Sequence, residues 1–477
     1  MVVVVVAMTS QQETTPSTQK MRRDELGGNR GQGHRLQEQG QRICRPDPRR
    51  LRQGPPDPSL TTVAGLVPFG AFLRQEHLDE RLGALFDGLK SGPKRVYGMA
   101  EQVRLMIDAQ AVGQPRVFGL ERLAQDPLFV HLAGGSVPSL DTVYRDLDRF
   151  GPLDLARLDV LMAEQGLWKH QLRQHEVVHL DIDTTVEPLF GHQEGALPGP
   201  NPRYHGRPSY HPILCRVAQS RTCVGALLRP GNTALGAEDV TYFRVLVRRV
   251  KQALRKQQAL RVRIDAAGDC TDLMAAIHDE GAHFLTKAKL TQDLRAAIFA
   301  HADWRTVIEN DDGTPARQVA DIPFARALWR EAGLSVRVIA VRTLEQTSGK
   351  QVQLWDDLDY TLKVYLTDDF DNDGDWLARD YEGRAGIEPL IGEYKHHLGI
   401  GAVPTDSLNA NHAMLLLKLL TYNLLRRFVS RVAPHLGAWQ LPWLRAALLS
   451  VPARLVRSGR RLVMRLAAGS VLLRLLT

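Results

Sequence analysis

The amino-acid sequence predicts an α/β fold preceded by a helical region. The chain has 477 residues and a hydrophobic fraction of 44%, enough for two or three globular domains. Between residues 61 and 174 the apolar side chains recur at the helical period, whereas from Glu176 they alternate as in a β-strand. Strands and helices then follow each other in a mixed order, which is typical of a sheet covered by helices.

The net charge, the cysteine count and the distribution of apolar residues indicate what kind of protein this is. A net charge of +8 and a pI of about 9.4 indicate a partner such as nucleic acid, although the charge is modest for this length. Four cysteines without a C-x-x-C pair are too few for a disulfide scaffold and favour a reduced, cytoplasmic compartment. No charge-free apolar run of about 18 residues occurs, so we expect no membrane span.

The N-terminal third is expected to contain two regions. Residues 1–60 are rich in Gln, Arg, Gly and Pro and predict a disordered basic leader, which either binds DNA loosely or has no role. Residues 61–174 predict short helices, one of them capped by Ser139 and carrying Arg145 and Arg149. This arrangement suits a helical DNA-binding region with a helix-turn-helix, and a generic helical domain is the alternative.

Residues 175–299 carry candidate metal ligands at strand ends. In the strand from Glu176, the side chains of His179, Asp181 and Asp183 share one face. Buried unpaired carboxylates are costly, so a divalent cation is a natural partner; alternatively the aspartates cap the strand end. Asp265 ends a later strand, and the carboxyl ends of neighbouring strands are where open α/β sheets build sites.

The loop 191–212 and the segment 368–380 are two further metal candidates that we rank low. The histidines of the loop, His192, His205 and His211, lack a familiar zinc spacing, and its basic side chains suit phosphate contact better. Residues 369–380 have the spacing of a calcium loop, but a strand precedes them instead of a helix. A solvated strand-to-helix turn is the preferred interpretation there.

The remaining C-terminal half divides into three parts. Residues 300–359 predict a β-rich insertion, after which a strand at 360–367 returns to the main sheet. Residues 360–435 end in a strongly apolar helix from Asn411, expected to pack on the sheet. Residues 436–477 predict a basic helical tail that packs on the fold, faces DNA or a partner, or lies on a membrane surface.

Residues 381–395, with the sequence YEGRAGIEPLIGEYK, concentrate functional side chains. If they are helical, Tyr381, Arg384, Glu388 and Lys395 lie within an arc of about 60°. That face suits a metal beside a phosphate, and an exposed helix with i,i+4 charge pairs is the alternative. Pro389 follows Glu388, so the helix either begins near Pro389 or kinks there.

Three carboxylates stand out in this reading: Asp183, Asp265 and Glu388. Phosphoryl transfer with two metals needs such a set, because the carboxylates hold the cations that activate the attacking oxygen and stabilise the leaving one.

The segments LDIDTTV from Leu180, RIDAAGD from Arg263 and the motif Y-x-x-R-x-x-x-E-x-x-x-x-x-x-K ending at Lys395 resemble a known family. They look like the DDE transposases of bacterial insertion sequences, most closely the insertion sequence 1380 group of the insertion sequence 4 superfamily. The resemblance covers about residues 60–470. It implies an RNase H-like catalytic core, formed by 175–299 and 360–435 and interrupted by the β-rich insertion, plus a helical N-terminal DNA-binding region.

The resemblance also implies roles for individual residues. Asp183, Asp265 and Glu388 would hold Mg²⁺, for which Mn²⁺ can substitute, and Tyr381, Arg384 and Lys395 would contact DNA phosphates. Asp181 would not be a ligand, because the family's aspartate directly precedes the Thr. The expected function is a DNA transposase that binds terminal inverted repeats, cleaves DNA and transfers strands.

The expected partners are double-stranded DNA, as element ends and as target, and a second copy of the chain in a homodimer. The expected location is the bacterial cytoplasm, at the nucleoid. The alternatives are an RNase H-like metal nuclease without strand transfer, and a catalytically silent DNA-binding protein derived from a transposase.

Overall fold

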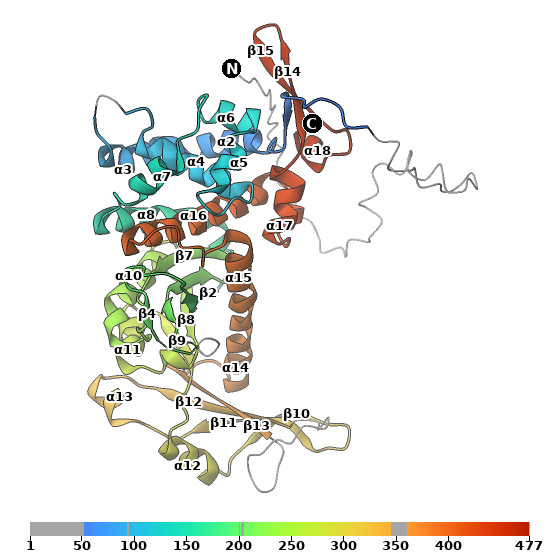
Figure 1. Cartoon of the computed structure of the whole chain (residues 1–477). Coiled ribbons are helices and arrows are strands. Elements are labelled where there is room, and N and C mark those ends of the chain that lie inside the picture. The colour runs from blue at the N-terminus through green and yellow to red at the C-terminus, as the bar shows by residue number, and fades with distance from the viewer. Residues whose placement is uncertain (1–51, 93–94, 200, 202–204, 345–359, 477) are drawn as a thin grey trace, which may run out of the picture.

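The computed structural model describes residues 52–476 apart from 93–94, 200, 202–204 and 345–359. Most of the predicted leader 1–60 therefore lies outside the described residues. The molecule is elongated, with helices at one end, a large sheet in the middle and a group of antiparallel strands at the other end (Figure 1). Within the described residues, no helix is both long and apolar enough to cross a membrane.

A nine-stranded mixed sheet, as the alternating pattern predicted, extends from the middle of the molecule to the end opposite the helices (Figure 1). Its order is β10-β11-β12-β13-β9-β8-β2-β6-β7. The central strands β2 (Val177–Thr184), β8 (Ala259–Ile264) and β9 (His283–Lys287) run parallel to one another. On one side of them, β6 (Ile213–Val217) and β7 (Thr222–Leu227) complete an antiparallel meander with β2. The carboxyl ends of β2 and β8 consequently meet at one edge of the sheet.

The two faces of β2 have different surroundings because its side chains alternate. Val178, Leu180 and Ile182 are fully buried in a hydrophobic core with α10 (Val240–Lys251) and α11 (Thr271–Asp279). The opposite face carries His179, Asp181 and Asp183. It is covered by α14 (Gly374–Glu382) and the residues that follow it, which run along the other side of the sheet (Figure 1).

The predicted β-rich insertion extends the same sheet. Its strands β10 (Arg305–Glu309), β11 (Pro315–Ile322) and β12 (Arg337–Leu344) are antiparallel, and α12 (Gln292–Ala300) and α13 (Ala327–Glu331) accompany them. β13 (Tyr360–Thr367) pairs with both β12 and β9. The expected return of strand 360–367 to the main sheet is therefore confirmed.

Short helices occupy the N-terminal part. They are α2 (Leu66–Gln75), α3 (Leu78–Phe86), α4 (Met99–Ala111), α5 (Gly119–Leu123), α6 (Pro127–Leu132), α7 (Leu140–Leu147), α8 (Pro152–Gly166) and α9 (Lys169–Leu172). Ser139 caps α7 as predicted, with its side chain accepting from the Thr142 amide. Arg149 was expected on the same helix as Arg145, but it lies beyond the end of α7, where its Nε donates to Asp146 at 2.9 Å.

The apolar helix α16 (Leu408–Val432) has a more central position than expected. It does contact the sheet, since Asn423 exchanges hydrogen bonds with the backbone of Cys223 in β7. Most of its length, however, is buried among the N-terminal helices, and Phe428 packs against Phe69 and Phe72 with ring centroids 5.5 and 5.6 Å apart. One hydrophobic core thus joins residues of the N-terminal third to residues 387–449.

The prediction of a helical tail at 436–477 is wrong for its longest part. Between α17 (Leu441–Leu444) and α18 (Val471–Leu476) lies a hairpin of β14 (Ala453–Ser458) and β15 (Arg461–Leu466). Exposed and partly buried residues alternate along β15, and Gly459 supplies a positive φ of 60° in a two-residue turn. β14 also pairs with β1 (Leu60–Thr61), which anchors the hairpin to the start of the fold.

Candidate active site

Asp183 and Asp265 meet at the carboxyl ends of β2 and β8. Each follows by two residues the last position at which β2 and β8 pair with each other, where Asp181 lies opposite Arg263. The Asp265 carboxylate caps the turn after β8 by accepting from the Ala267 amide at 3.0 Å. Burial raises the pKa of Asp183, attraction to Arg384 opposes this rise, and repulsion from Asp265 adds to it. The two carboxylates are therefore close enough to influence each other's charge.

Arg384 connects the YEGRAGIE segment to this pair. Its Nη2 lies 3.1 Å from Asp183 Oδ1 and also donates to the carbonyl of Ile182 at 3.1 Å. The side chain is buried, and its Nε has no hydrogen-bond partner among the described residues. The predicted phosphate ligand is thus held against the predicted metal ligand by an ion pair.

Tyr381 lies near the end of α14, where this helix packs on the sheet, and its side chain is only 5% exposed. Its ring packs against Tyr365 with centroids 5.0 Å apart, and its hydroxyl is a buried group without a hydrogen-bond partner among the described residues. Burial raises the pKa of Tyr381 to about 12. A contact with a DNA phosphate would require this hydroxyl to become accessible, so its predicted role stays a prediction.

Lys395 reaches the chain just beyond β2. Its Nζ donates to the carbonyl of Val186 at 2.9 Å and lies 3.2 Å from Glu187 Oε1. Glu187 begins the short strand β3 (Glu187–Pro188), which pairs with β5 (Pro208–Tyr210) and belongs to a small sheet with β4 (Leu197–Pro198). Burial raises the pKa of Glu187 although the attraction of Lys395 lowers it. Arg384 and Lys395 therefore bracket the end of β2.

Glu388 is exposed, and the structure does not bring it into one cluster with the two aspartates. It is the second residue of α15 (Ile387–Glu393), which follows a 3₁₀ turn at Gly383–Gly386 and precedes a π-helical turn at Tyr394–Leu398. Among the described residues, no group of three potential metal ligands is close enough to hold an ion. Glu388 does lie between Arg384 and Lys395 in a nearly continuous helical segment that runs past the end of β2.

Pro389 fits this helical segment without a break. It is the third residue of α15, in the first turn, where a backbone N–H has no intrahelical acceptor to lose. The first of the two sequence interpretations, in which the helix begins near Pro389, is therefore correct. The 3₁₀ and π turns mean that the arc of about 60° calculated for a regular α-helix is only approximate here.

Asp181 has a partner that the sequence interpretation missed. It is fully buried, and its carboxylate accepts from Arg216 Nε and Nη2 at 3.0 and 2.8 Å and from Arg263 Nε at 2.6 Å. A divalent cation is therefore not needed to compensate its charge. The alternation of Arg261 and Arg263 on β8, on the same face as Asp181 on β2, was the available signal.

The same arginines position the helical segment on the sheet. Arg216 Nη1 donates to the carbonyl of Gly386 at 2.7 Å, and Arg263 Nη1 donates to the carbonyl of Asp380 at 2.5 Å. Arg261 bridges Asp380 and Asp369 at 2.8 and 2.5 Å. His179 Nε2 completes the network 2.8 Å from Asp380. Charged contacts thus hold α14 and its continuation over β2 and β8, while Leu377, Ala378 and Tyr381 of α14 pack in an apolar cluster with side chains of the neighbouring strands.

The carboxylates of the calcium-like segment are engaged in the strand-to-helix turn that we preferred. Asp369 accepts from the amides of Asp371 and Asn372 at 3.1 and 3.0 Å as well as from Arg261. Asp373 caps α14 by accepting from the amides of Asp375 and Trp376. Asp380 points into the arginine network described above.

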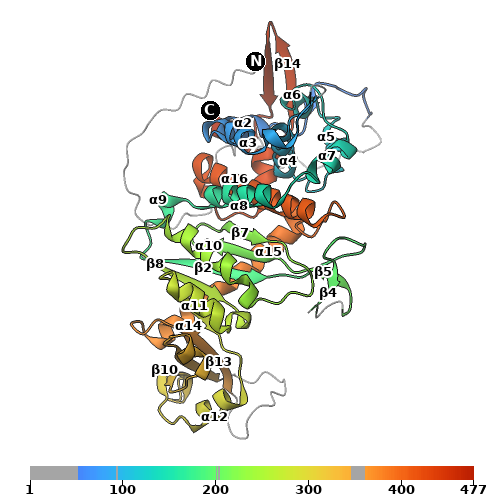
Figure 2. The same ribbon diagram turned by 90° about the vertical axis from the view of Figure 1, so that its left-hand side faces the viewer.

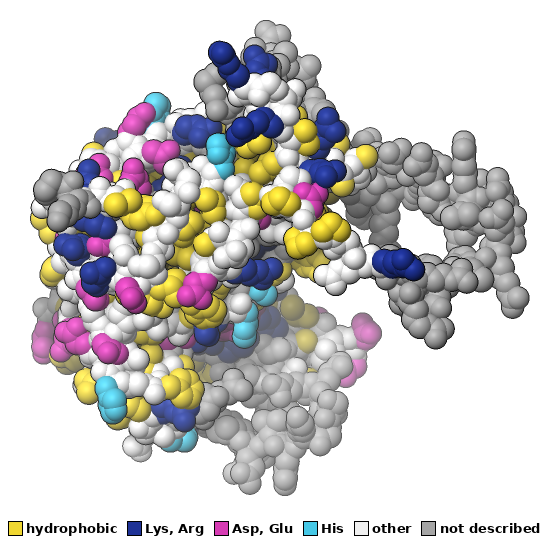
Figure 3. All heavy atoms as spheres, turned by 45° about the horizontal axis from the view of Figure 1, so that its top comes forward, with side chains coloured by type: hydrophobic (Ala, Val, Ile, Leu, Met, Phe, Trp, Pro, Cys, Tyr) yellow, Lys and Arg dark blue, Asp and Glu magenta, His cyan; other side chains and the backbone are white. Residues whose placement is uncertain are grey.

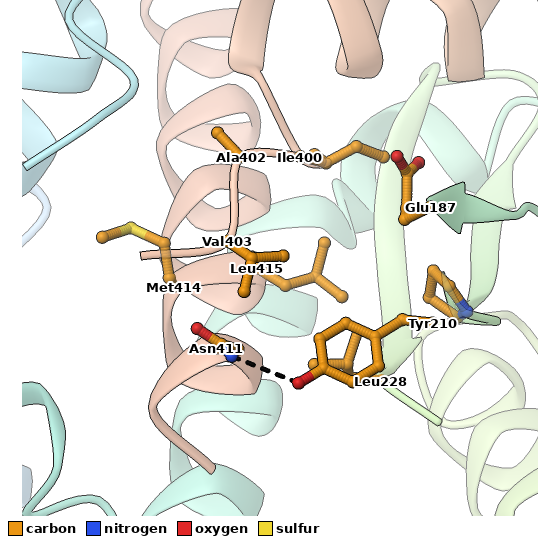
Figure 4. Close-up of a pocket in the computed structure, with 10 residues that line it drawn as sticks. Glu187, Tyr210, Leu228, Ile400, Ala402, Val403, Asn411, Met414 and Leu415 are labelled. Carbon is orange, nitrogen blue, oxygen red and sulfur yellow. Dashed lines mark hydrogen bonds between the residues drawn. The ribbon is translucent and has the colours of Figure 1, made fainter. Parts of the chain in front are cut away.

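The histidine-containing loop is partly outside the described residues, which include neither Arg203 nor its neighbours. His211 is buried, its Nδ1 lies 2.6 Å from the carbonyl of Thr233, and burial lowers its pKa. A small cavity nearby is bounded by Glu187, Tyr210 and Asn411, and the Tyr210 hydroxyl accepts from Asn411 at 3.3 Å (Figure 4). Its volume of about 10 Å³ is at most that of one water, so it is no substrate pocket.

The two aspartates fit a divalent cation by their chemistry. Mg²⁺ prefers oxygen ligands and is usually held by one or two carboxylates together with substrate phosphates. Asp183 and Asp265 supply two carboxylates whose mutual repulsion a cation would offset. Glu388 offers an exposed third carboxylate on the adjoining helix.

A comparison with known protein families agrees with this chemistry. A family model described as "Transposase DDE domain group 1" matches residues 58–477. The chain is also similar to a solved structure, the cryo-EM structure of a piggyBac transposase synaptic complex with hairpin DNA. The identity is 11%, the match covers 80% of each chain, and the TM-score is 0.42. No curated protein matches the chain.

Proposed function

We propose that this chain, which belongs to the family with a transposase DDE domain of group 1, cleaves DNA at the ends of a mobile element and joins those ends to target DNA. The main support for the proposal is that Asp183 and Asp265 lie at neighbouring strand ends. In addition, Arg384 of the signature motif forms an ion pair with Asp183.

We assign the region around β2 to an RNase H-like core. Three antiparallel strands, β2, β6 and β7, are followed by the parallel strands β8 and β9. The helix α10 precedes β8, and α11 connects β8 to β9. The insertion β10–β12 then enters between the second aspartate and the glutamate. This order supports the assignment because Asp183 and Asp265 then lie at the same end of the sheet.

The proposed metal ligands are Asp183, Asp265 and Glu388, and the proposed ion is Mg²⁺, with Mn²⁺ as a substitute. When bound, such cations would lower the pKa of the attacking water and stabilise the leaving oxygen. The chain itself contributes the placement of the carboxylates: β2 and β8 fix two of them, and the arginine network fixes the helix that carries the third.

Arg384, Lys395 and Tyr381 are proposed to orient the DNA end. Arg384 and Lys395 lie on either side of the end of β2, so a phosphate near Asp183 would face both cations. In the structure, the Arg384 guanidinium is paired with Asp183 and the Lys395 ammonium is paired with Glu187. Phosphate oxygens would compete for these cations, while a metal ion would take over the charge of Asp183.

The proposed partners are double-stranded DNA, both as terminal inverted repeats and as target, and a second copy of the chain in the DNA complex. The proposed setting is an insertion sequence of the 1380 group in a bacterial cytoplasm, at the nucleoid. The described parts of residues 61–174 would help to bind the element ends.

Cleavage of DNA carrying the element ends tests the proposal. We expect Asp183→Asn and Glu388→Gln to lose Mg²⁺-dependent cleavage while binding of the ends persists in a gel-shift assay. Glu382→Gln, which changes a glutamate at the end of α14, is the matched control and should cleave. Normal cleavage by Glu388→Gln would refute the assignment of the third carboxylate.

A strand-transfer assay separates the proposal from its rivals. Cleavage without joining of a pre-cut end to target DNA would indicate a nuclease. End binding without any Mg²⁺- or Mn²⁺-dependent cleavage would indicate a silent DNA-binding protein. The exposed position of Glu388 is the feature that keeps this second alternative in view.

A further inference from the structure

The positive charge of this chain is concentrated at its C-terminal end. Asp406 is the last acidic residue, and the 71 residues that follow it contain 11 lysines and arginines. This excess is larger than the net charge of +8 for the whole chain, so residues 1–406 together carry a small negative charge. Lys418, Arg426 and Arg445 are buried, and the other basic side chains of residues 407–477 would attract a polyanion where they reach the surface.

Within this segment, the hairpin β14–β15 projects furthest from the fold (Figures 1 and 2). Its base is anchored, because β14 pairs with β1 and the Leu455 amide donates to the carbonyl of Ser59 at 2.8 Å. Met464 packs beside the main core, and Ala453 is buried in a small cluster with Ala64 and Leu472. The half of the hairpin near Gly459 has no such packing, and its residues from Arg457 to Arg461 are exposed.

One face and the tip of the hairpin are basic. The register places Arg454 directly opposite Arg465 and Ser458 opposite Arg461 on one face, and Arg460 lies in the turn. Like charges directly opposite each other destabilise a hairpin. Arg454 is partly compensated by Asp57 at 3.0 Å, whereas Arg457, Arg460, Arg461 and Arg465 form no ion pair with any residue that the structure describes.

Seen from this end, Lys and Arg side chains gather on and around the projection (Figure 3). We propose that the β14–β15 hairpin is a DNA-binding ribbon that contacts the phosphate backbone of duplex DNA away from the site of cleavage. This inference rests on the proposed function, since it supplies a second contact for the same DNA.

The dimensions of the hairpin suit this partner. Six residues per strand at about 3.3 Å per residue give a ribbon about 20 Å long. The major groove of B-DNA, about 12 Å wide, admits a two-stranded β-ribbon. Arginines at the edges and tip of such a ribbon would reach the phosphates that border the groove, while the exposed Val463 between them carries no charge.

Binding of full-length protein to duplex DNA tests the inference. The probe is a labelled duplex of about 30 base pairs, three helical turns, in buffer with a chelator so that cleavage is absent. The variant Arg460→Gln, Arg461→Gln, Arg465→Gln changes three unpaired positions. If each arginine neutralises one phosphate, the slope of log affinity against log salt should become shallower by about 2.7. The affinity at low salt should fall by at least about tenfold.

A charge-matched control distinguishes a local contact from a change in net charge. Arg173→Gln, Lys256→Gln, Arg295→Gln removes the same charge from exposed positions outside the hairpin. We expect this control to leave the salt slope nearly unchanged. Equal effects of the two triple variants would overturn the inference, and so would an unchanged slope in the hairpin variant.

Two further readouts keep the outcomes separate. Thermal unfolding of the hairpin variant should occur at the same temperature as for the unaltered chain or slightly higher, because the three side chains have no described ion-pair partner and Arg465→Gln removes the repulsion from Arg454. A loss of folding would be resolved by testing Arg460→Gln alone at the turn. A change of oligomeric state with unchanged DNA affinity would make the hairpin a contact between copies and overturn the proposal. Absence of DNA binding by the unaltered chain would instead refute the proposed function.

Discussion

Asp181 and Asp183 lie two residues apart on one face of β2, yet replacing each by asparagine should affect stability differently. Asp181 is fully buried between Arg216 and Arg263 and accepts three hydrogen bonds from them. Asp183 contacts one arginine and lies at the edge of the site. The prediction is that Asp181→Asn destabilises the fold, whereas Asp183→Asn does not.

The expected magnitude follows from the partners that remain. Removing one member of a buried ion pair costs about 3–5 kcal/mol, because the other charge stays buried without compensation. In Asp181→Asn, Arg216 keeps the carbonyl of Gly386 and Arg263 keeps Asp380, and the asparagine oxygen can still accept one bond. We therefore expect a loss near the lower limit, about 3 kcal/mol.

Replacing Asp183 by asparagine should change the free energy of unfolding in the opposite direction. Its pKa is raised in the folded chain, so its contribution to stability is present at low pH and is lost as pH rises through the folded pKa. Above that pKa the carboxylate is charged at a site that disfavours the charge, and asparagine removes this penalty. Asp183→Asn should thus fold at least as stably as the unaltered chain at neutral pH, and its advantage should shrink in acid.

Urea unfolding at neutral pH with a chelator measures both variants without any bound metal. The free energies of unfolding are compared at equal m-values, since a changed m-value would signal a change in the unfolded state or in cooperativity. A loss of less than about 1 kcal/mol for Asp181→Asn would refute the argument that the arginine network is buried and uncompensated without this carboxylate. An equal loss for Asp183→Asn would refute the distinction between the two aspartates.

Two other predictions concern the surroundings of the site. Gly268→Ala should destabilise by about 1–3 kcal/mol, because a Cβ there would lie 2.6 Å from Ile264 Cβ and 2.7 Å from Thr286 Oγ1. Gly392→Ala in α15, where a Cβ meets nothing within 4 Å, is its control and should be neutral or stabilising in urea unfolding. Burial lowers the pKa of Lys418 to about 7, so the unfolded chain binds more protons above that pH. Relative to Lys418→Met, the unaltered chain should gain stability from about pH 7 to about pH 10, and a flat difference in thermal unfolding would argue against this shift.

Much of the local structure was predictable because it depends on residues near in sequence. The period switch at Glu176 located β2, the apolar run from Asn411 located α16, and the strand-to-helix turn expected within residues 369–380 leads into α14. The short motifs LDIDTTV and the Tyr381–Lys395 pattern predicted a DDE transposase, and the family model agrees with this prediction.

The C-terminal hairpin shows where this local reasoning failed. Residues 453–466 are apolar with regular arginines, a composition that both an amphipathic helix and an alternating strand can carry. The pairing of Ala453 with Thr61, almost the whole chain length away, decides the outcome. Such long-range pairing leaves no signal in a local window.

The candidate chemistry could be named from the residues alone: the carboxylates, the arginine and the lysine, and the kinds of element on which they lie. The partners of these side chains depend on how the strands are arranged in the folded chain. Asp181 and Asp183 look equivalent on one strand face, but the arginines of neighbouring strands neutralise the first and leave the second at the edge with Asp265. A buried charge is stable only when it is paired with an opposite charge, and the order of the strands in the sheet determines which charged side chain lies beside it.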